Sequence, residues 1–339
     1  RVLFRSEQME QFDSGNLDHR EAHGLLYLQR SDLQKSEQQD QAAKVWESLL
    51  QSDATDPVLT SRVAGLMQRA GMIDRAEQLY RRSIEQAPDQ AQYREYLGDL
   101  LHREGKTQEA IQVWQEIAAP PRRTAESLIR LSEVLRRFGH LNEAVSAARS
   151  AIEISPSTDS RIFLAGLLAE LAKSHADAGQ SSEFQTASDE ALLELDRAET
   201  TAAENDRPAL LSARVSILET TGRLKKETDR LTEFLQKQAV ADAKLWERLA
   251  TFSESLGEYE QATSATLQQL KFDIESTSAL QRLTDLYERT GRIGDAIEAI
   301  GRLAKVQPGN RIELQRRIAR LQSKLGRHDE ALAAGEMLI

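Results

Sequence analysis

The sequence predicts an all-α protein: an α-α superhelix, a right-handed solenoid of about nine helical hairpins. Eight glycines recur with successive spacings of 34, 34, 40, 43, 35, 34 and 35 residues. Apolar residues with a helical period lie on both sides of each glycine, which is typical of two helices joined by a tight turn. Self-similarity at this period indicates a helical repeat array. The glycines are Gly71, Gly105, Gly139, Gly179, Gly222, Gly257, Gly291 and Gly326.

The composition agrees with paired amphipathic helices. Charged residues make up 29% of the 339 residues, aromatic residues 5%, and there are 7 prolines. Cysteine is absent, which excludes disulfides, thiolate zinc sites and cysteine nucleophiles. The net charge of −10 disfavours a nucleic-acid partner, because phosphate binding draws its affinity from clustered Lys and Arg. No run approaches the roughly 18 apolar residues that a membrane span needs.

The first hairpin diverges from the later ones. Residues 1–17 lack the period, so we interpret them as a lead-in or as the tail of a preceding element. Asp18 is expected to cap a helix that continues through about Gln34, and a second helix containing Trp46 follows. Glu37 lies 34 residues before Gly71, where a turn glycine would be expected. The turn of this hairpin must therefore be made differently.

Three regular units follow, at residues 57–88, 89–123 and 124–156. Asp56 and Pro57 provide an N-cap and a proline at the first helical position. Small residues lie in the first helices, an alanine follows most turn glycines by five residues, and a proline follows three of them by 17. Small residues let helices approach closely, and glycine supplies the left-handed backbone of a short turn. The three sets are Ala64, Gly98 and Ala250; Ala76, Ala110, Ala144, Ala262, Ala296 and Ala331; and Pro88, Pro156 and Pro308.

This combination resembles the tetratricopeptide repeat, whose unit has 34 residues. The resemblance extends over roughly residues 19–339 and implies a solenoid that serves as a protein–protein interaction scaffold. The middle repeats depart from the pattern, since Phe184 and Glu227 stand five residues after their glycines. The Lys and Asn clamp of the family's chaperone-tail binders is also missing, with Ser61, Glu95 and Ile129 at successive equivalents of one clamp position.

Both limbs of the hairpin around Gly179 are longer than elsewhere, so a lengthened hairpin is expected at about residues 157–207. A helical apolar stripe continues through both limbs, which favours extra helix over loop. Units at 207–241, 242–275 and 276–310 follow, and an incomplete last repeat begins at Arg311. The predicted array therefore covers residues 18–339.

No residue pattern indicates catalysis, a metal or a cofactor, so we expect a protein that is not an enzyme. Gly105-Lys106-Thr107 imitates the end of a phosphate-binding loop, but Leu100 stands where that motif needs glycine. His19 and His23 have the i, i+4 spacing of metal ligands, yet no third ligand is evident nearby. These features are best explained as a repeat turn and a helix face.

The resemblance implies that the first helix of each unit lines a concave groove. A partner would lie in that groove, and its acidic later half favours a protein or peptide segment with basic residues. Two alternatives remain: a nucleic-acid-binding helical repeat, and a module that positions a catalytic domain outside this segment. The candidate groove residues are Glu95, Asp99, Glu133, Arg136, Glu247, Glu254, Asp285, Glu288, Arg316 and Arg320.

The chain ends within the apolar stripe of its last helix, at Leu338 and Ile339. A solenoid normally ends with a helix whose outer face is polar. We therefore expect the natural protein to continue past residue 339. We also expect weak end-to-end self-association of this segment through Leu332, Leu338 and Ile339.

Overall fold

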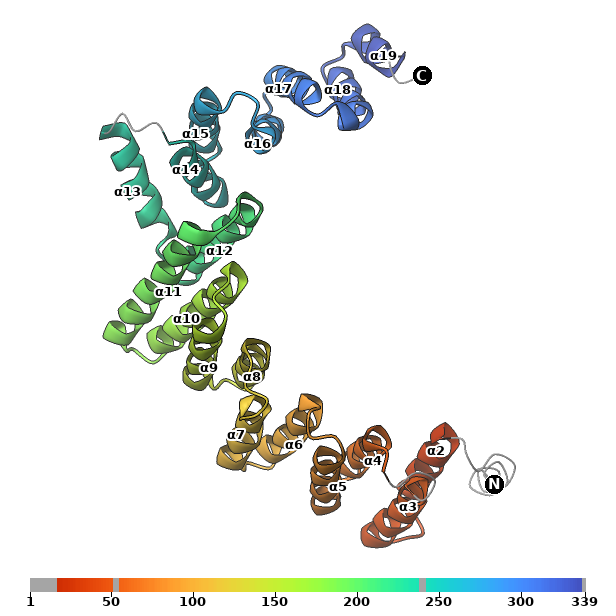
Figure 1. Cartoon of the computed structure of the whole chain (residues 1–339). Helices are drawn as coiled ribbons and strands as arrows, with labels where there is room; N and C mark the ends of the chain where they lie inside the picture. Colours follow the sequence, from red (N-terminus) through yellow and green to blue (C-terminus); the bar gives the residue numbers. More distant parts are fainter. Residues whose placement is uncertain (1–16, 51–54, 238–241, 337–339) are drawn as a thin grey trace. The chain divides into compact units, whose positions relative to one another are not determined.

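The computed structural model describes residues 17–50, 55–237 and 242–336. Within these ranges the chain forms 18 α-helices and three short 3-10 helices, and it contains no strand (Figure 1). Successive α-helices pair into nine antiparallel hairpins. The predicted all-α solenoid class is thereby confirmed.

The hairpins fall into two compact units, residues 1–156 and 157–339. The first unit contains α2 (Leu17–Tyr27), α3 (Lys35–Leu49), α4 (Pro57–Arg69), α5 (Ile73–Gln86), α6 (Ala91–Arg103), α7 (Thr107–Gln115), η1 (Glu116–Ala118), α8 (Ala125–Arg137) and α9 (Leu141–Ile154). The second contains α10 (Thr158–Asp177), α11 (Ser181–Thr201), η2 (Glu204–Asp206), α12 (Arg207–Thr220), α13 (Leu224–Lys237), α14 (Ala243–Ser255), α15 (Tyr259–Phe272), α16 (Thr277–Arg289), α17 (Ile293–Val306), η3 (Pro308–Asn310), α18 (Arg311–Lys324) and α19 (His328–Glu336).

Each regular hairpin buries the alanine that follows its turn glycine by five residues. This alanine lies in the first turn of the second helix, and its side chain is fully buried at Ala76, Ala110, Ala144, Ala262 and Ala296. The second helix also packs against the first helix of the next hairpin, as α5 does on α6 and α15 on α16. The core is therefore continuous along the hairpins of each unit.

The turn glycines adopt the predicted left-handed backbone, which Gly105 illustrates with a φ of +77°. Its N–H donates to the carbonyl oxygen of His102 at 3.0 Å, and the N–H of Lys106 donates to that of Leu101 at 2.9 Å. These bonds satisfy two backbone carbonyl groups at the end of α6. Helix α7 begins at Thr107, the residue that follows Lys106. The glycine thus sets the tight reversal between the two helices.

Glycine at the small position of a first helix makes room for tryptophan. A Cβ at Gly98 would lie 2.0 Å from Nε1 of Trp114, and one at Gly24 would lie equally close to Nε1 of Trp46. Both tryptophans are fully buried. Gly24 therefore marks the small position of the divergent first hairpin, which the sequence analysis did not recognise.

The predicted extent of the first helix is wrong. The helix α2 ends at Tyr27, and a turn over residues 28–34 precedes α3. Asp18 lies inside the first turn of α2 and is not its cap. Glu37 lies in the first turn of α3 and accepts the backbone N–H of Gln34 at 3.1 Å. The apolar residues at 28 and 33 mimic a helical stripe, but they belong to this longer turn.

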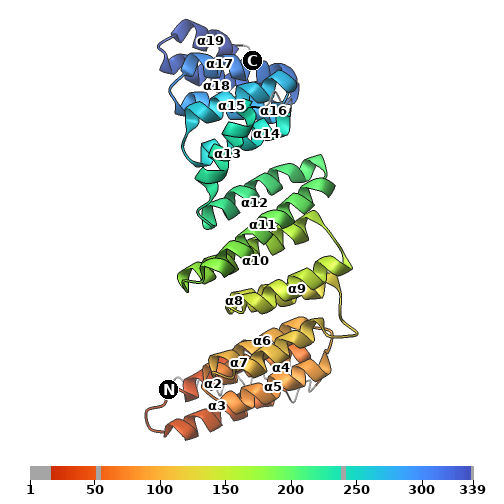
Figure 2. The same ribbon diagram turned by 90° about the vertical axis from the view of Figure 1, so that its left-hand side faces the viewer.

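Helix starts elsewhere agree with the local sequence signals. Asp56 accepts the N–H of Val58, and Asp242 accepts that of Lys244, both at 2.8 Å. Helices α10 and α11 have 20 and 21 residues, whereas α12 to α18 have 13 or 14. The additional residues of this hairpin are therefore helical, and the two long helices lie along each other (Figure 2).

The hairpin of α12 and α13 is open. Figure 1 shows α13 diverging from α12, and the two helices approach each other over a shorter length than in the other hairpins. Glu227 occupies the position where the regular hairpins bury alanine. Its carboxylate pairs with Arg230 at 3.0 Å. Because an unpaired buried charge is costly, Glu227 keeps partial access to solvent and the helices stay apart.

On α19, Leu332 is 67% exposed. Leu338 and Ile339 lie outside the described residues, as does the proposed lead-in before Leu17. Self-association through the chain end stays a prediction.

We predict that Gly105→Ala lowers the melting temperature by the equivalent of about 1 kcal/mol, because alanine is strained at positive φ. Gly301→Ala is the matched control, since this helical glycine also has open space around its Cβ position but no positive φ. There alanine should stabilise the helix by about 0.5–1 kcal/mol. Thermal unfolding followed by circular dichroism measures both. Equal effects of the two changes would contradict the strained-turn account.

We predict that Glu227→Ala raises the melting temperature, because alanine lets α13 approach α12 and bury apolar surface. Glu233→Ala, an exposed change on the same helix, provides the comparison for loss of one carboxylate. Differential scanning calorimetry should show a rise for Glu227→Ala alone. A fall in melting temperature would show that the carboxylate stabilises the open hairpin.

Candidate functional site

An arginine at one fixed repeat position connects successive first helices. It stands nine residues before the turn glycine in five hairpins: Arg62, Arg130, Arg248, Arg282 and Arg317. In the two hairpins nearest the C-terminus, this side chain reaches back to the preceding first helix. Arg317 on α18 contacts Asp285 and Glu288 on α16, each at 2.6 Å. Arg282 on α16 pairs with Glu254 on α14 at 3.6 Å and donates to the hydroxyl of Thr251 at 3.0 Å.

The first unit uses the same arginine position with different acidic partners. Arg62 on α4 contacts Asp18 and Glu21 on α2 at 2.6 and 2.7 Å. Arg130 on α8 pairs with Glu95 on α6. We refer to the five arginines as the bridging arginines. The sequence signal that marks them is their fixed spacing of nine residues before the turn glycine.

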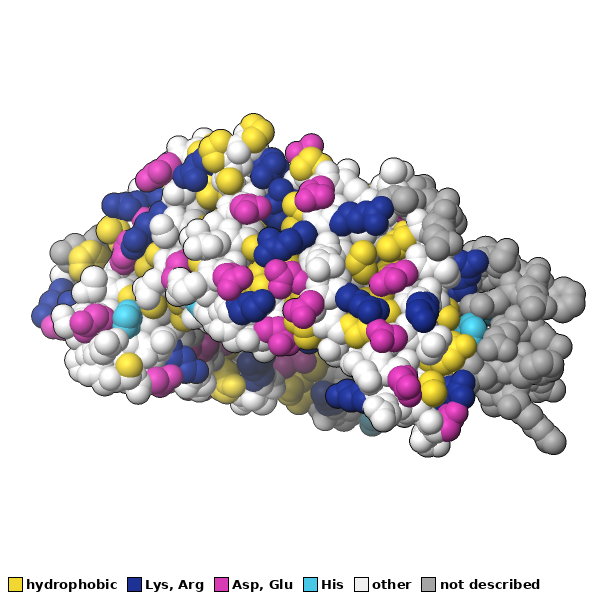
Figure 3. Space-filling model, turned by 90° about the horizontal axis from the view of Figure 1, so that it is seen from below, with side chains coloured by type: hydrophobic (Ala, Val, Ile, Leu, Met, Phe, Trp, Pro, Cys, Tyr) yellow, Lys and Arg dark blue, Asp and Glu magenta, His cyan; other side chains and the backbone are white. Residues whose placement is uncertain are grey.

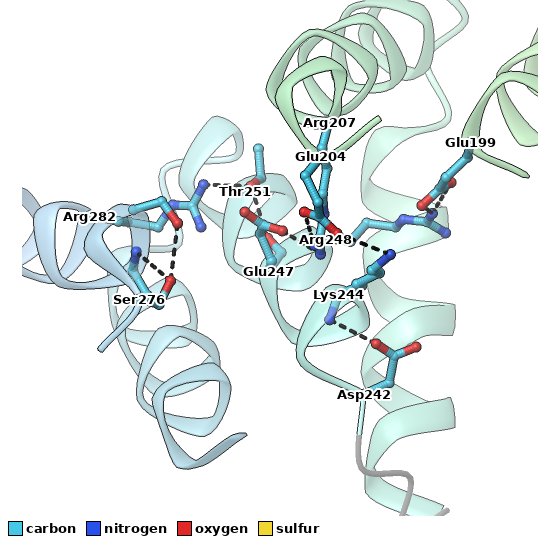
Figure 4. Close-up of polar contacts among 12 residues, drawn as sticks. Glu199, Glu204, Arg207, Asp242, Lys244, Glu247, Arg248, Thr251, Ser276 and Arg282 are labelled. Atoms are coloured by element: carbon cyan, nitrogen blue, oxygen red, sulfur yellow. Dashed lines mark hydrogen bonds and ion pairs between the residues drawn. The ribbon is translucent and has the colours of Figure 1, made fainter. Parts of the chain in front are cut away.

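Arg248 differs from the other four bridging arginines because its ion pair is with α11 and not with the preceding first helix. Its Nη2 contacts both carboxylate oxygens of Glu199 on α11, at 2.5 and 2.7 Å (Figure 4). Glu199 also pairs with Arg214 of α12 at 3.3 Å, and Arg214 contacts Asp196 at 2.5 Å. Burial and the positive charge of Arg214 lower the pKa of the Arg248 guanidinium. The long helix α11 thus takes the place of α12 as the partner of this arginine.

The second unit adds two ion pairs around the start of α14. Arg207 on α12 contacts Glu247 on α14 at 2.6 Å, and Lys244 lies 3.7 Å from Glu204 (Figure 4). Asp242 caps the same helix through the N–H of Lys244. The charged side chains labelled in Figure 4 therefore come from α11, η2, α12, α14 with its cap, and α16, and acidic and basic groups lie next to one another.

Six of the seven acidic residues predicted to line the groove pair with arginines. Arg130 holds Glu95, Arg207 holds Glu247, and Arg317 holds both Asp285 and Glu288. Glu254 lies between Arg282 and Arg289. Asp99 pairs with Arg103, one turn away on the same helix.

The remaining predicted residues are basic or lie on α8. Arg316 and Arg320 are 3.8 and 3.7 Å from Glu313, and Glu133 and Arg136 are exposed. On the face drawn in Figure 3, basic and acidic side chains are intermingled. Their mutual pairing leaves little excess negative charge on the first helices.

Two family models of the tetratricopeptide repeat match the sequence, one over residues 68–123 and the other over residues 125–158. This chain is a tetratricopeptide repeat protein. The matches cover α5 to α9, and the same helical pairing continues on both sides of them. No curated protein matches the chain.

Among solved structures, MamA of AMB-1 is 21% identical, with 51% of this chain and 88% of that chain covered and a TM-score of 0.32. YrrB, described as a TPR protein with an unusual peptide-binding site, is 11% identical. It covers 78% of this chain and 94% of its own, with a TM-score of 0.25. Conclusions about this chain rest on the family models and on its own helices, because these scores are below 0.5.

The described residues contain no group of three His, Asp or Glu side chains placed to hold a metal ion. His23 is buried and packs against Tyr27, with ring centroids 5.1 Å apart. No helix in the described ranges is long and apolar enough to cross a membrane. Tetratricopeptide repeats generally act as non-catalytic scaffolds.

We predict that Arg317→Ala loosens the contact between α16 and α18, because two carboxylates lose their shared partner. Burial alone would lower the pKa of Arg317, but its hydrogen bonds to Asp285 and Glu288 raise it, so the guanidinium stays charged. The loss should be about 1 kcal/mol and should shrink at high salt. Hydrogen exchange of the α18 amides measures it.

Arg316→Ala is the control for this prediction, since Arg316 has only a 3.8 Å contact within its own helix. Its exchange rates should match those of the parent. If both variants exchange equally fast, the bridge contributes nothing to the stacking.

Proposed function

We propose that this tetratricopeptide repeat protein is an interaction scaffold that binds a peptide or helix of a partner protein along its first helices. Tetratricopeptide repeat proteins bind proteins or peptides. The proposed location of the bound segment and its form go beyond this general property. Both are supported by the ion pairs that connect the first helices within each unit.

The observation that carries the proposal is the set of bridging arginines. Four of the five cross-links join two neighbouring first helices, as Arg317 does through two contacts of 2.6 Å. A surface whose helices are already fixed loses little conformational entropy when a segment binds, so more of the contact energy appears as affinity. The bridges thus support a preorganised binding surface.

The charge of the bound segment is a separate matter. A basic segment would have to compete with Arg130 for Glu95 and with Arg317 for Asp285. Such competition reduces the gain from each new ion pair, because the carboxylate is already satisfied. The preference for basic residues stays a prediction, and it requires that the partner displace or share these arginines.

A nucleic-acid partner is less well supported. The five bridging arginines recur at a fixed position, which is a feature of helical repeats that bind RNA. Each of them, however, contacts a carboxylate of its own chain. Phosphate binding would have to break these pairs, and the net charge of −10 opposes it. A role in positioning a catalytic domain outside this segment stays a further alternative.

The test is a selection of peptides from a random display library against the whole chain, with affinities measured by fluorescence polarisation. We predict that reversing Glu254, Asp285 and Glu288 to arginine weakens the selected peptides at least tenfold, about 1.4 kcal/mol. The control reverses three acidic residues outside the first helices, Glu260, Asp273 and Glu298. This change alters the net charge equally and should alter affinity less than twofold.

Circular dichroism must show that both triple variants keep the parent's helix content. Equal loss of affinity in the two variants would leave only a general charge effect and would contradict binding along the first helices. Tight, salt-sensitive binding of single-stranded RNA by the parent would favour the alternative partner instead.

A further inference from the structure

The open hairpin of α12 and α13 contains a cavity of about 330 Å³. It exists because α13 stands away from α12 where Glu227 replaces the buried alanine of regular hairpins. The volume is at the lower end of the range for ligand pockets and suits one or two side chains of a partner. The cavity is lined by Leu192, Arg214, Leu218, Glu227, Arg230, Leu231, Phe234, Arg248 and Phe252.

Apolar side chains from four helices contribute to the lining. Leu192 comes from α11, Leu218 from α12, Phe234 from α13 and Phe252 from α14. Phe234 is 41% exposed although it is aromatic. An exposed aromatic residue beside a hollow is a favourable contact for an incoming apolar side chain.

Three arginines line the same cavity at a regular spacing. Arg214 precedes Leu218, Arg230 precedes Phe234, and Arg248 precedes Phe252, in each case by four residues, which is one helical turn. Glu227 is the single carboxylate in the lining. Arg230 pairs with Glu227, and Arg214 and Arg248 pair with Asp196 and Glu199 just outside the lining. The cavity therefore combines an apolar wall with guanidinium groups whose charge is balanced by neighbouring carboxylates.

Arg214 and Arg248 keep hydrogen-bond donors available. Arg214 is only 9% exposed, and among the described residues it bonds Asp196 and Glu199 through Nη2 alone. Arg248 likewise bonds Glu199 through Nη2. A guanidinium carries five N–H donors, so Nε and Nη1 of both residues can serve a further acceptor. A carboxylate is the acceptor that matches this planar fork best.

We propose that this cavity binds an acidic-apolar segment of the partner protein, inserting a leucine or phenylalanine side chain with a neighbouring aspartate or glutamate facing the arginines. The inference rests on the proposed scaffold function and adds a specific pocket to it. The side chain gains apolar contact with Phe234 and Phe252. The carboxylate accepts from N–H groups of Arg214 and Arg248 that their own ion pairs do not use.

The probe is a fluorescein-labelled peptide with an Asp-Leu-Phe-Asp core between Gly/Ser flanks, titrated into the whole chain. Two control peptides carry asparagine in place of aspartate, or alanine in place of the Leu-Phe pair. Each control peptide should bind at least tenfold more weakly than the probe. If the asparagine peptide binds as tightly as the probe, the arginines do not bind the carboxylates of the probe, and that part of the proposal is overturned.

Two variants locate the site. Phe234→Ala removes part of the apolar wall, and Arg230→Glu reverses a charge in the lining. Both side chains are exposed, so the fold should persist, which circular dichroism checks. Each variant should weaken the probe at least fivefold. Lys237→Glu is the matched control for the charge change, since Lys237 is exposed on the same helix and is not part of the lining. It should alter affinity less than twofold, and equal losses for Arg230→Glu and Lys237→Glu would overturn the proposal.

The outcomes separate this inference from the proposed function. Selected peptides that respond to the triple first-helix variant but not to Phe234→Ala would overturn the pocket and leave the scaffold standing. Binding of phenylacetate without any binding of the probe would overturn the assignment to a protein segment. A probe that depends on Phe234 and Arg230, together with selected peptides unaffected by the first-helix variant, would support the pocket and contradict the extended binding surface.

Discussion

The close approach of the two helices within each hairpin is the constraint on which the rest of this array depends. In the regular hairpins small residues lie at the crossing: Ala110 is fully buried, and Gly98 lies beside the ring of Trp114. The apolar surface buried between the two helices forms the core of each hairpin, and stacking of neighbouring hairpins joins these cores into one. Where Glu227 replaces the alanine, the helices part and a cavity appears between α12, α13 and α14. A charged side chain at the alanine position thus coincides with a candidate binding site, whereas Phe184 at the same position leaves α10 and α11 closely paired.

The bridging arginines act between hairpins and also determine what the first helices offer to a partner. Arg282 and Arg317 satisfy acidic residues that would otherwise form an acidic strip. Exposed ion pairs contribute little stability individually, about 0–1 kcal/mol, but several at one repeat position fix the register of neighbouring helices. Recognition on such a surface depends on shape and on exchange of ion pairs. The cavity beside Arg214 and Arg248 is different, because its apolar walls lie beside arginines whose ion pairs use Nη2 alone among the described residues.

The features that follow from local backbone chemistry could be predicted well. Turn glycines with positive φ, the cap at Asp56 and the order of the helices each depend on residues a few positions apart. The first hairpin is the exception. Its turn covers residues 28–34, and apolar residues there imitate a helical stripe. The pairing of Gly24 with Trp46 would have revealed the small position, but that contact is between helices and is not visible in a local pattern.

The sequence by itself determined that this chain is a helical repeat array, because a period near 34 residues and a left-handed turn are encoded in each unit. It also contained the repeated arginines and the exceptional Glu227. Only the tertiary structure decided their consequences. Glu95 and Arg130 stand 35 residues apart and pair across stacked helices, whereas Arg248 turns to Glu199, which lies 49 residues away on α11. Sequence register identifies the helical face of a long side chain, but the partner depends on how neighbouring helices stack and how far each guanidinium reaches.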